Sequence, residues 1–298
     1  MTADILSVHL PGDRVRPLLE AAEDADGIAA FSESFVQGLD DERVRHTHFL
    51  VEDNGDVVAC AGLAEDGSAE LVVHPEHRRN GIGEALARKV RTEHVDAGLW
   101  AHGNLPGAKA LAAKLGLSLA RELLVMGISA GDIPDGGPEL PAGFEALDYV
   151  GAVERWGREA VEKQWLEVNN DAFSWHPEQG GWDLDRLKEG MDTDWFDPNG
   201  VRLLWDVSGE PELAGFHWTK RHSRTLGEVY VVGLASNYRG TGLGEPLMRA
   251  GLEHLVNGGA QRVILYVESD NEPAVKRYVD MGFSVAERHV VYSNQRSL

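Results

Sequence analysis

The sequence contains two copies of a glycine-rich turn followed by an amphipathic helix, and this repeat constrains the fold more than any other feature. Arg78 and Arg239, 161 residues apart, each open an Arg-x-x-Gly-x-Gly turn that follows an apolar strand. Such a turn points several backbone N–H groups at one spot, beside the positive end of a helix dipole. Glycine leaves room for an anion to reach those N–H groups. The sequence therefore predicts two cradles for a diphosphate group.

The similarity between the two halves extends beyond these turns. After each helix come a strand, a short helix that ends near Gly116 or Gly282, and a last apolar strand. Order and approximate spacing that recur across half the chain indicate a duplicated domain. We expect domains at 1–130 and 144–298, joined by a linker at 131–143. This linker holds three prolines and four glycines, which cannot continue a helix or a central strand.

Hydrophobic periodicity gives a coarse secondary structure for both halves. In the first half we expect helices at 13–23, 27–38, 81–96 and 106–115, and strands at 46–52, 56–64, 68–73, 99–102 and 119–127. In the second half we expect helices at 150–170, 242–256 and 271–281, and strands at 201–207, 212–219, 227–234, 261–267 and 284–292. The halves differ mainly in an insertion-like stretch at 164–197 that is rich in Trp, Asp and Gly.

Composition agrees with a two-domain enzyme that works in the cytoplasm. The chain has 298 residues, and its 43% hydrophobic content is enough for two cores. No apolar run is long enough to span a bilayer, and the first residues lack the basic start of a signal peptide. A net charge of −21 disfavours nucleic acid and anionic membranes as partners. The single cysteine, Cys60, is expected to be buried, and no metal site and no stable oligomer are expected.

Both halves resemble the GCN5-related N-acetyltransferase (GNAT) superfamily, in which this turn holds the diphosphate of acetyl-CoA. The resemblance implies an α+β fold with a mixed α/β sheet in each of two tandem domains, and acetyl-CoA as co-substrate. It places a first, non-catalytic CoA site on Leu71, Val72, Val73, Arg79, Asn80, Gly81, Ile82, Gly83 and Glu84. It places a second, catalytic CoA site on Val232, Gly233, Leu234, Arg239, Gly240, Thr241, Gly242, Leu243, Gly244, Glu245, Asn271, Glu272, Pro273, Ala274, Val275 and Lys276.

The two halves are not equally equipped for proton transfer. Aligning Arg78 with Arg239 places Gly67 opposite Glu228, and aligning Gly116 with Gly282 places Ala112 opposite Tyr278. The second half therefore has a carboxylate and a phenol that the first lacks in register. Acetyl transfer to an amine uses one group that removes a proton from the ammonium and another that protonates the departing thiolate. We expect Glu228 to be the base and Tyr278 the acid, although each could also be an ordinary surface or packing residue.

A narrower resemblance links most of the chain to the mycothiol synthase family of tandem acetyltransferases. The segments that carry it are 176–182, 215–220, 227–233 and 265–271. It implies transfer of acetyl to the cysteinyl amine of cysteinyl-glucosaminyl-inositol, a small pseudo-disaccharide, by the second domain. It also places substrate contacts on Glu33, Glu178, Lys220, Glu228 and Tyr266. The chain departs from the family pattern at Ala235–Tyr238 and at Gly240-Thr241, where basic charge near the diphosphate is lost.

Two other functions remain open from the sequence. The same scaffold could acetylate a different amine, such as an aminoglycoside or a protein N-terminus, which a broad acidic groove would favour. Alternatively, the chain could be a non-catalytic acyl-CoA sensor that uses both cradles for binding. The presence of Glu228 and Tyr278 in one half argues against the sensor.

Overall fold

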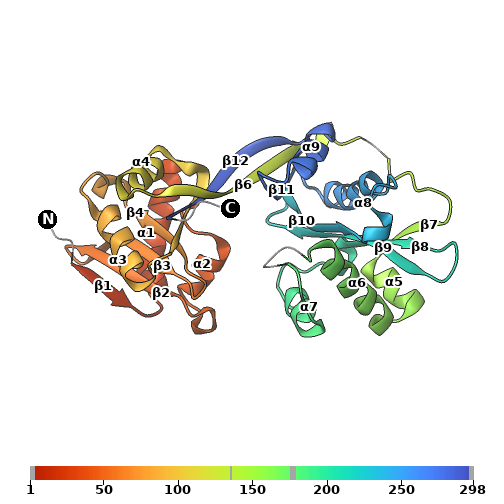
Figure 1. The fold of residues 1–298 in the computed structure, drawn as a ribbon, viewed down its shortest axis with the longest axis horizontal. Coiled ribbons are helices and arrows are strands. Elements are labelled where there is room, and N and C mark those ends of the chain that lie inside the picture. The colour runs from red at the N-terminus through yellow and green to blue at the C-terminus, as the bar shows by residue number, and fades with distance from the viewer. Residues whose placement is uncertain (1–3, 135, 175–178, 295–298) are drawn as a thin grey trace. The chain divides into compact units, whose positions relative to one another are not determined.

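The computed structural model describes residues 4–134, 136–174 and 179–294, and these form two compact units (Figure 1). Unit 1 comprises residues 1–124, 268–272 and 287–298, and unit 2 comprises residues 125–267 and 273–286. Each unit is built on a mixed sheet with helices on both faces.

The first repeat is built from the helices and strands of residues 5–129. They are β1 (Ile5–Val8), α1 (Gly12–Asp26), α2 (Glu33–Gly38), β2 (Thr47–Asp53), β3 (Asp56–Leu63), β4 (Ser68–Val73), α3 (Ile82–Glu93), β5 (Gly98–Ala101), α4 (Pro106–Leu115) and β6 (Ser118–Ser129). Those of the second repeat are β7 (Phe144–Asp148), α5 (Tyr149–Trp156), α6 (Arg158–Ala172), α7 (Leu184–Met191), β8 (Val201–Asp206), β9 (Glu212–Arg221), β10 (Leu226–Leu234), α8 (Gly244–Asn257), β11 (Arg262–Glu268), α9 (Glu272–Asp280) and β12 (Ser284–Ser293).

The sheets of the two units share one topology. In unit 1 the strand order is β1-β2-β3-β4-β5-β12, and in unit 2 it is β7-β8-β9-β10-β11-β6. The first four strands of each sheet pair antiparallel, and β4 with β5 and β10 with β11 form parallel pairs. A parallel pair needs a crossover connection, and α3 and α8 supply it. The cradle turns therefore lie where β4 and β10 lead into these helices.

Each sheet buries an apolar layer on both faces. In unit 1, Leu86 and Val90 of α3 pack with one face of the sheet, and Val15 and Leu18 of α1 pack with the other. In unit 2, α8 covers one face, and α5, α6 and α7 cover the other (Figure 1). On this second face the ring centres of Trp165 and Trp218 lie 5.0 Å apart. Because each sheet is covered on both sides, its central strands are almost continuously buried.

The last strand of each repeat ends in the other unit. Strand β6 begins in unit 1, but from Val125 onward it belongs to unit 2. Strand β12 begins in unit 2, and from Glu287 onward it belongs to unit 1, where residues 290–292 pair antiparallel with β5. The two units therefore differ from continuous segments of sequence at these two strands and at residues 268–272, which group with unit 1.

Most of the expected elements are present, and the differences have local causes. The expected helix at 27–38 is confined to α2, because Gly27 ends α1 in a left-handed conformation with φ +71°. The expected helix at 150–170 is two helices, since Gly157 at φ +83° interrupts it. The short elements β1, β7 and α7 were not expected from the sequence. Cys60 is fully buried, as predicted, and burial raises the pKa of its thiol.

Among the described residues, no helix is both long and apolar enough to cross a membrane.

Buried histidines make the stability of the fold depend on pH. His217 of β9 is fully buried against α8, and desolvation lowers its pKa to about 4. Its pKa in the unfolded chain is about 6.5, so acid favours the unfolded state. We expect full stability above pH 6.5 and a loss of up to about 3 kcal/mol from this group as the pH falls from 6.5 to 4.

Urea unfolding of His217→Gln at several pH values checks this prediction. The variant should be less stable at pH 7 but should lose less stability between pH 6.5 and 4 than the wild type. Replacing the exposed His9 in the same way serves as the control. An unchanged pH slope in His217→Gln would show that burial does not suppress protonation of this imidazole.

Candidate active site

In each unit the parallel strands that flank the cradle separate before they end. Strand β10 pairs with β11 only from Leu226 to Val229, although β10 continues to Leu234. In unit 1, β4 pairs with β5 only at Ser68 and Ala69, although β4 continues to Val73. Beyond these points, among the described residues, this edge of β4 and of β10 pairs with no other strand, so a ligand can bond the backbone there. An extended acyl chain can therefore lie along each edge.

The two cradles share left-handed backbone conformations at the same two positions of the motif. The second residue of the motif, Arg79 or Gly240, has φ +66° or +77°, and the fourth, Gly81 or Gly242, has φ +81° or +91°. The helices then begin at Ile82 and Gly244, so their first N–H groups have no partner within the helix. Two segments of different sequence thus share the left-handed positions of an anion-binding turn, which supports the prediction of two diphosphate cradles.

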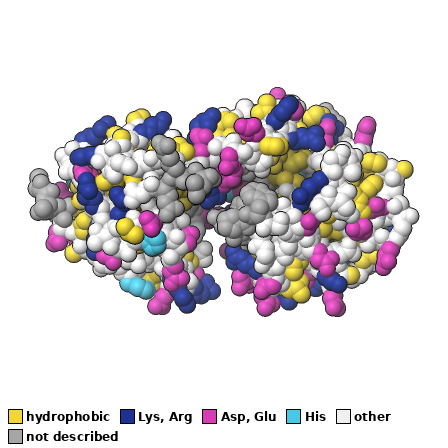
Figure 2. All heavy atoms as spheres, in the orientation of Figure 1, with side chains coloured by type: hydrophobic (Ala, Val, Ile, Leu, Met, Phe, Trp, Pro, Cys, Tyr) yellow, Lys and Arg dark blue, Asp and Glu magenta, His cyan; other side chains and the backbone are white. Residues whose placement is uncertain are grey.

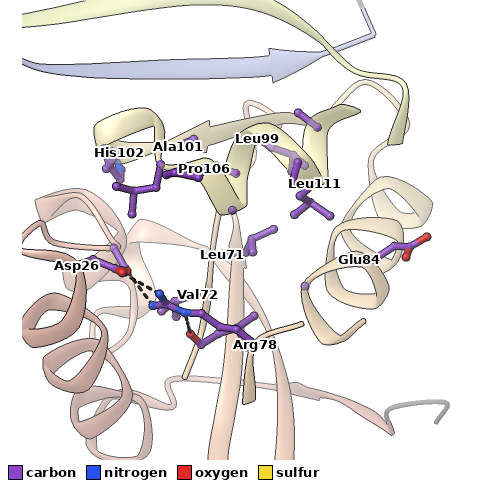
Figure 3. Close-up of a pocket in the computed structure, with 18 of the residues that line it drawn as sticks. Asp26, Leu71, Val72, Arg78, Glu84, Leu99, Ala101, His102, Pro106 and Leu111 are labelled. Atoms are coloured by element: carbon purple, nitrogen blue, oxygen red, sulfur yellow. Dashed lines mark hydrogen bonds and ion pairs between the residues drawn. The ribbon is translucent and has the colours of Figure 1, made fainter. Parts of the chain in front are cut away.

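The first arginine of each motif holds the turn together. Arg78 Nε donates to the Val73 carbonyl at 3.0 Å, and its guanidinium forms two 2.7 Å bonds with Asp26 (Figure 3). Arg239 Nε likewise donates to the Leu234 carbonyl at 3.2 Å, and its Nη2 donates to the Asp171 carbonyl at 2.9 Å. The prediction that Arg239 binds CoA is therefore better supported for its backbone than for its side chain.

The third residue of each motif also bonds to its own turn. Thr241 Oγ1 donates to the Tyr238 carbonyl at 2.6 Å, and Asn80 Nδ2 donates to the His77 carbonyl at 3.3 Å. In the first cradle, Glu84 forms ion pairs with Lys114 and Arg88 at 2.5 and 2.9 Å. Lys114 and then Arg88 lower the pKa of Glu84. These contacts leave the backbone N–H groups of the turn as the ligand-binding surface.

A cavity of about 520 Å³ opens beside the cradle of unit 1 (Figure 3). Its lining includes eight of the nine residues predicted for the first CoA site, the exception being Asn80. Leu71 and Leu111 point into it, and His102 and Pro106 border the end away from Glu84 (Figure 3). Tyr292 of β12 also lines this cavity and donates from its hydroxyl to Asn104 Oδ1 at 2.8 Å. The residues present therefore fit an acyl-CoA, with its diphosphate at the glycines and its thioester arm along Leu71–Val73.

In unit 2, three predicted substrate residues share one face of the sheet. Glu228 lies directly opposite Lys220 of β9 and opposite Ile264 of β11, so their side chains project to the same side. Tyr266 follows two residues after Ile264 and therefore projects to that side as well. Its position lies just beyond the last pair between β10 and β11, beside the opening between the strands.

The carboxylate of Glu228 is buried and has a direct connection to solvent. Its side chain is 7% exposed, and Oε2 lies 2.5 Å from Nε2 of His222, whose side chain is 31% exposed. Within the part of the chain that the structure describes, Oε1 of Glu228 has no recorded partner. Lys220 is also buried, with its ammonium 4.8 Å from the centre of the Trp195 ring. A carboxylate with one open oxygen and a histidine leading outward can take up a proton and release it to solvent.

Unit 1 has a buried carboxylate of a different kind. Glu70 of β4 accepts a bond from the Ser32 N–H at 2.7 Å, and its other oxygen lies 3.0 Å from Nε2 of His102. His102 in turn contacts His289 of β12 at 2.7 Å. Each oxygen of Glu70 thus has a protein contact, one with Ser32 just before α2 and one with His102 just after β5, rather than facing the cavity.

The register of Glu228 differs by one residue from the prediction. The last parallel pair is Ala69–Leu99 in unit 1 and Val229–Leu265 in unit 2. Glu228 comes one residue before Val229, so it corresponds to Ser68, one residue before Ala69, and not to Gly67. The physical reason is a bulge in β10 between Val229 and Val231, which adds Tyr230 to the strand. The conclusion that unit 1 lacks a carboxylate at this position is unchanged.

Tyr278 lies on α9, in the same unit as Glu228. Its ring packs 6.0 Å from that of the buried Phe283, and the Phe283 N–H donates to the Tyr278 carbonyl at 3.0 Å. Burial raises the pKa of its phenol above the ordinary value. The hydroxyl therefore stays protonated at neutral pH, as a general acid requires.

The remaining predicted residues fall in several places. Glu33 is the first residue of α2 in unit 1, and Glu178 lies outside the described residues. Asn271 and Glu272 group with unit 1, whereas Pro273–Lys276 group with unit 2. His222 and Trp195 were not anticipated from the sequence. A histidine at the end of a strand, two residues after Lys220, is the signal that could have identified His222.

Comparison with known proteins identifies the family. The description "Acetyltransferase (GNAT) family" matches residues 158–283, and "Acetyltransferase (GNAT) domain" matches residues 45–116. A mycothiol acetyltransferase of Corynebacterium aurimucosum is 50% identical, over 94% of this chain and 94% of its own. Those of Corynebacterium efficiens and Corynebacterium diphtheriae are 49% and 47% identical, over 98% and 96% of this chain and 97% and 94% of theirs.

The chain belongs to the mycothiol acetyltransferase family. It is an N-acetyltransferase with two GNAT domains, and GNAT enzymes use acetyl-CoA. Solved structures agree with the fold. A GCN5-related N-acetyltransferase from Sphaerobacter thermophilus is 19% identical with a TM-score of 0.72, over 99% of this chain and 98% of that one. A tandem GNAT protein from the clavulanic acid biosynthesis pathway is 22% identical with a TM-score of 0.69, over 97% of each chain.

Family membership confirms the predicted superfamily, the tandem fold and the enzyme class.

Proposed function

We propose that the chain transfers acetyl from acetyl-CoA to the cysteinyl amine of cysteinyl-glucosaminyl-inositol, the last step of mycothiol biosynthesis. The observation that carries the proposal is the buried Glu228, which has one open carboxylate oxygen and lies beside the opening between β10 and β11. Relatives named mycothiol acetyltransferase, which match nearly the whole chain, support this substrate. The catalytic domain is the second one, residues 144–298.

The reaction begins with the amine, which is largely protonated at neutral pH because an α-amino group has a pKa of roughly 7.7–8.0. Oε1 of Glu228 accepts the ammonium proton, and His222 passes it to solvent. The free amine attacks the thioester carbonyl, whose oxygen is stabilised by N–H groups of β10 beyond Val229. As the tetrahedral intermediate collapses, the C–S bond breaks, Tyr278 protonates the CoA thiolate, and the attacking nitrogen loses a second proton, which restores the phenol. An amide and CoA are formed.

The acceptor is held by the residues around Glu228. Lys220 and Tyr266 project to the same face and can bond the hydroxyl groups of the sugar and inositol. The C-terminal CoA site comprises Val232–Leu234, Arg239–Glu245 and Asn271–Lys276. The glycines at 240 and 242 adopt left-handed conformations that permit the approach of a diphosphate.

The unit 1 cavity is proposed to be a second acetyl-CoA site without turnover. Its lining fits the ligand, but Glu70, the buried carboxylate described beside it, has both oxygens engaged. A bound acyl-CoA there stabilises the folded chain by mass action.

We also propose that the enzyme works in the cytoplasm as a monomer, without a metal ion, nucleic acid or membrane. The net charge of −21 supports the absence of nucleic acid and anionic membranes as partners. On the face shown in Figure 2, lysine and arginine side chains are interspersed with acidic ones on both units. The proton-transfer groups named above need no metal.

Competition between amines tests the proposed substrate. The purified protein is given acetyl-CoA with cysteinyl-glucosaminyl-inositol, an aminoglycoside and a peptide with a free N-terminus. We expect kcat/KM for cysteinyl-glucosaminyl-inositol to exceed the others by at least about 100-fold, equivalent to roughly 2.7 kcal/mol of transition-state binding. A higher value for either competitor would assign a different acceptor, and binding without any turnover would assign a sensor.

Replacing Tyr278 by phenylalanine tests the general acid. We expect kcat to fall by about 10- to 100-fold, because a positioned acid is lost, with KM for acetyl-CoA within about threefold. Tyr292→Phe, which removes the phenol that lines the cavity of unit 1, is the matched control and should leave kcat unchanged. An equal effect of both substitutions, or none for Tyr278→Phe, would remove Tyr278 from the mechanism.

A further inference from the structure

In each unit, the first glycine of the cradle helix has side chains of the preceding strand beside it and one side chain from the following helix, α4 or α9. The chemistry of this last side chain differs between the units. A methyl group added at Gly83 would lie 3.9 Å from Cδ2 of Leu111 on α4. A methyl group added at Gly244 would lie 3.9 Å from Nη2 of Arg277 on α9. Leu111 and Arg277 therefore occupy equivalent places, one apolar and one cationic.

The second residue of each turn differs in the opposite way, because it is a cation in unit 1 and a glycine in unit 2. Arg79 is the exposed residue at the left-handed second position of the first motif, where the second motif has Gly240. A non-glycine residue in that conformation is uncommon, so the arginine is held at some cost in backbone strain. Unit 1 thus has its cation on the turn and a leucine on the helix. Unit 2 has a glycine on the turn and its cation on the helix.

The other cations around the two cradles already have partners. Arg78 pairs with Asp26, Lys114 with Glu84, and Lys276 with Asp280. Arg239 donates to the carbonyl of Asp171. In contrast, the side chains of Arg79 and Arg277 have no recorded hydrogen bond or ion pair within residues 4–134, 136–174 and 179–294. Each cradle therefore has one cation available to a ligand.

We propose that Arg277 binds the diphosphate of acetyl-CoA in the cradle of unit 2, replacing the turn arginine that this motif lacks. The proposal rests on the proposed function, because it assigns a further ligand to the same CoA site. A guanidinium bonds two phosphate oxygens at once, and such charge-assisted bonds are stronger than neutral ones. Placed beside Gly244, it adds charge at the point where the first N–H groups of α8 converge.

Titration calorimetry of the full chain with CoA tests this assignment. Loss of a charge-assisted bond predicts that Arg277→Leu weakens CoA binding about 10- to 100-fold at one site and leaves the unit 1 site unchanged. KM for acetyl-CoA should rise by a similar factor while kcat stays within about threefold. Arg277→Lys, which keeps the charge but not the fork, should retain part of the affinity. Arg224→Leu, an exposed arginine in the turn before β10, is the matched control and should bind CoA like the wild type.

Shortened ligands show which phosphate Arg277 contacts. If it binds the diphosphate, Arg277→Leu should weaken CoA and 3′-dephospho-CoA by the same factor and leave pantetheine binding unchanged. A loss confined to CoA would assign Arg277 to the 3′-phosphate, and an equal loss for pantetheine would mean that the substitution disturbs the fold of the site. Either result would overturn the proposal.

Moving the charge within unit 1 provides an independent test. Arg79→Gly should weaken the unit 1 site, and Arg79→Gly combined with Leu111→Arg should restore it, because the pair copies the arrangement of unit 2. Failure of the leucine-to-arginine change to recover affinity would contradict the equivalence of these positions. The binding experiments do not require turnover. If the wild type fails to acetylate the cysteinyl amine, the proposed function fails while the titrations still decide the role of Arg277.

Discussion

Replacing Glu228 by glutamine is expected to lower kcat at pH 7 by at least about 100-fold while acetyl-CoA still binds, as is typical of removing a positioned base. Glutamine has nearly the same shape, so the strand pairing with Lys220 and the contact with His222 remain possible. It cannot accept a proton from the ammonium. Initial rates at saturating acetyl-CoA, together with calorimetric binding of CoA, measure the two effects separately.

The pH dependence of this variant distinguishes a base from a structural carboxylate. The defect should shrink as the pH rises past roughly 8, because the amine then arrives already deprotonated. Glu70→Gln, the buried carboxylate of unit 1, is the control and should leave kcat unchanged. Turnover of Glu228→Gln within threefold of the wild type at pH 7 would remove the base assignment.

The second prediction with a large effect is that acetyl transfer requires the cradle of unit 2 but not the cradle of unit 1. Valine at both Gly242 and Gly244 is expected to abolish acetylation, because the side chains block the backbone N–H groups and Gly242 has φ +91°. The same change at Gly81 and Gly83 should remove CoA from the cavity of unit 1 but leave kcat largely intact. Neither Ser68 nor Ala112, at the positions equivalent to Glu228 and Tyr278, can transfer protons as those residues do.

Thermal unfolding with and without CoA accompanies this comparison. Each double variant should lose the stabilisation that its own site contributes, which amounts to about 2.7 kcal/mol per site at a ligand concentration of 100 times the Kd. This measurement shows whether the variant is folded before its kcat is interpreted. If the Gly81/Gly83 variant folds normally yet loses acetyl transfer while the Gly242/Gly244 variant keeps it, the catalytic half has been assigned wrongly.

The sequence predicted those features that repeat in it. The two cradles, their flanking strands and the helices that follow are where the pattern of glycines and apolar residues indicates. Aligning Gly116 with Gly282 pairs Leu111 with Arg277, and the structure places both side chains at the same distance from the first glycine of the cradle helix. Local backbone chemistry determines such features, so a single sequence is enough to locate them.

Features that depend on distant parts of the chain were not predictable in this way. The bulge at Tyr230 shifts the register of Glu228 by one residue, and an ungapped alignment of the two halves cannot reveal it. The final strands β6 and β12 have similar apolar patterns, so nothing in their sequence indicates that each ends in the other unit. His222 becomes informative only once the turn between β9 and β10 brings it to Glu228.

The most direct test of the account is a single-turnover experiment with acetyl-CoA and cysteinyl-glucosaminyl-inositol, followed by mass spectrometry that locates the new acetyl group. We expect acetyl on the cysteinyl nitrogen for the wild type and for the Gly81/Gly83 variant, and no product for the Gly242/Gly244 variant. Acetyl on the thiol, or product from the Gly242/Gly244 variant but not from the Gly81/Gly83 variant, would contradict the claim that the second unit acetylates this amine.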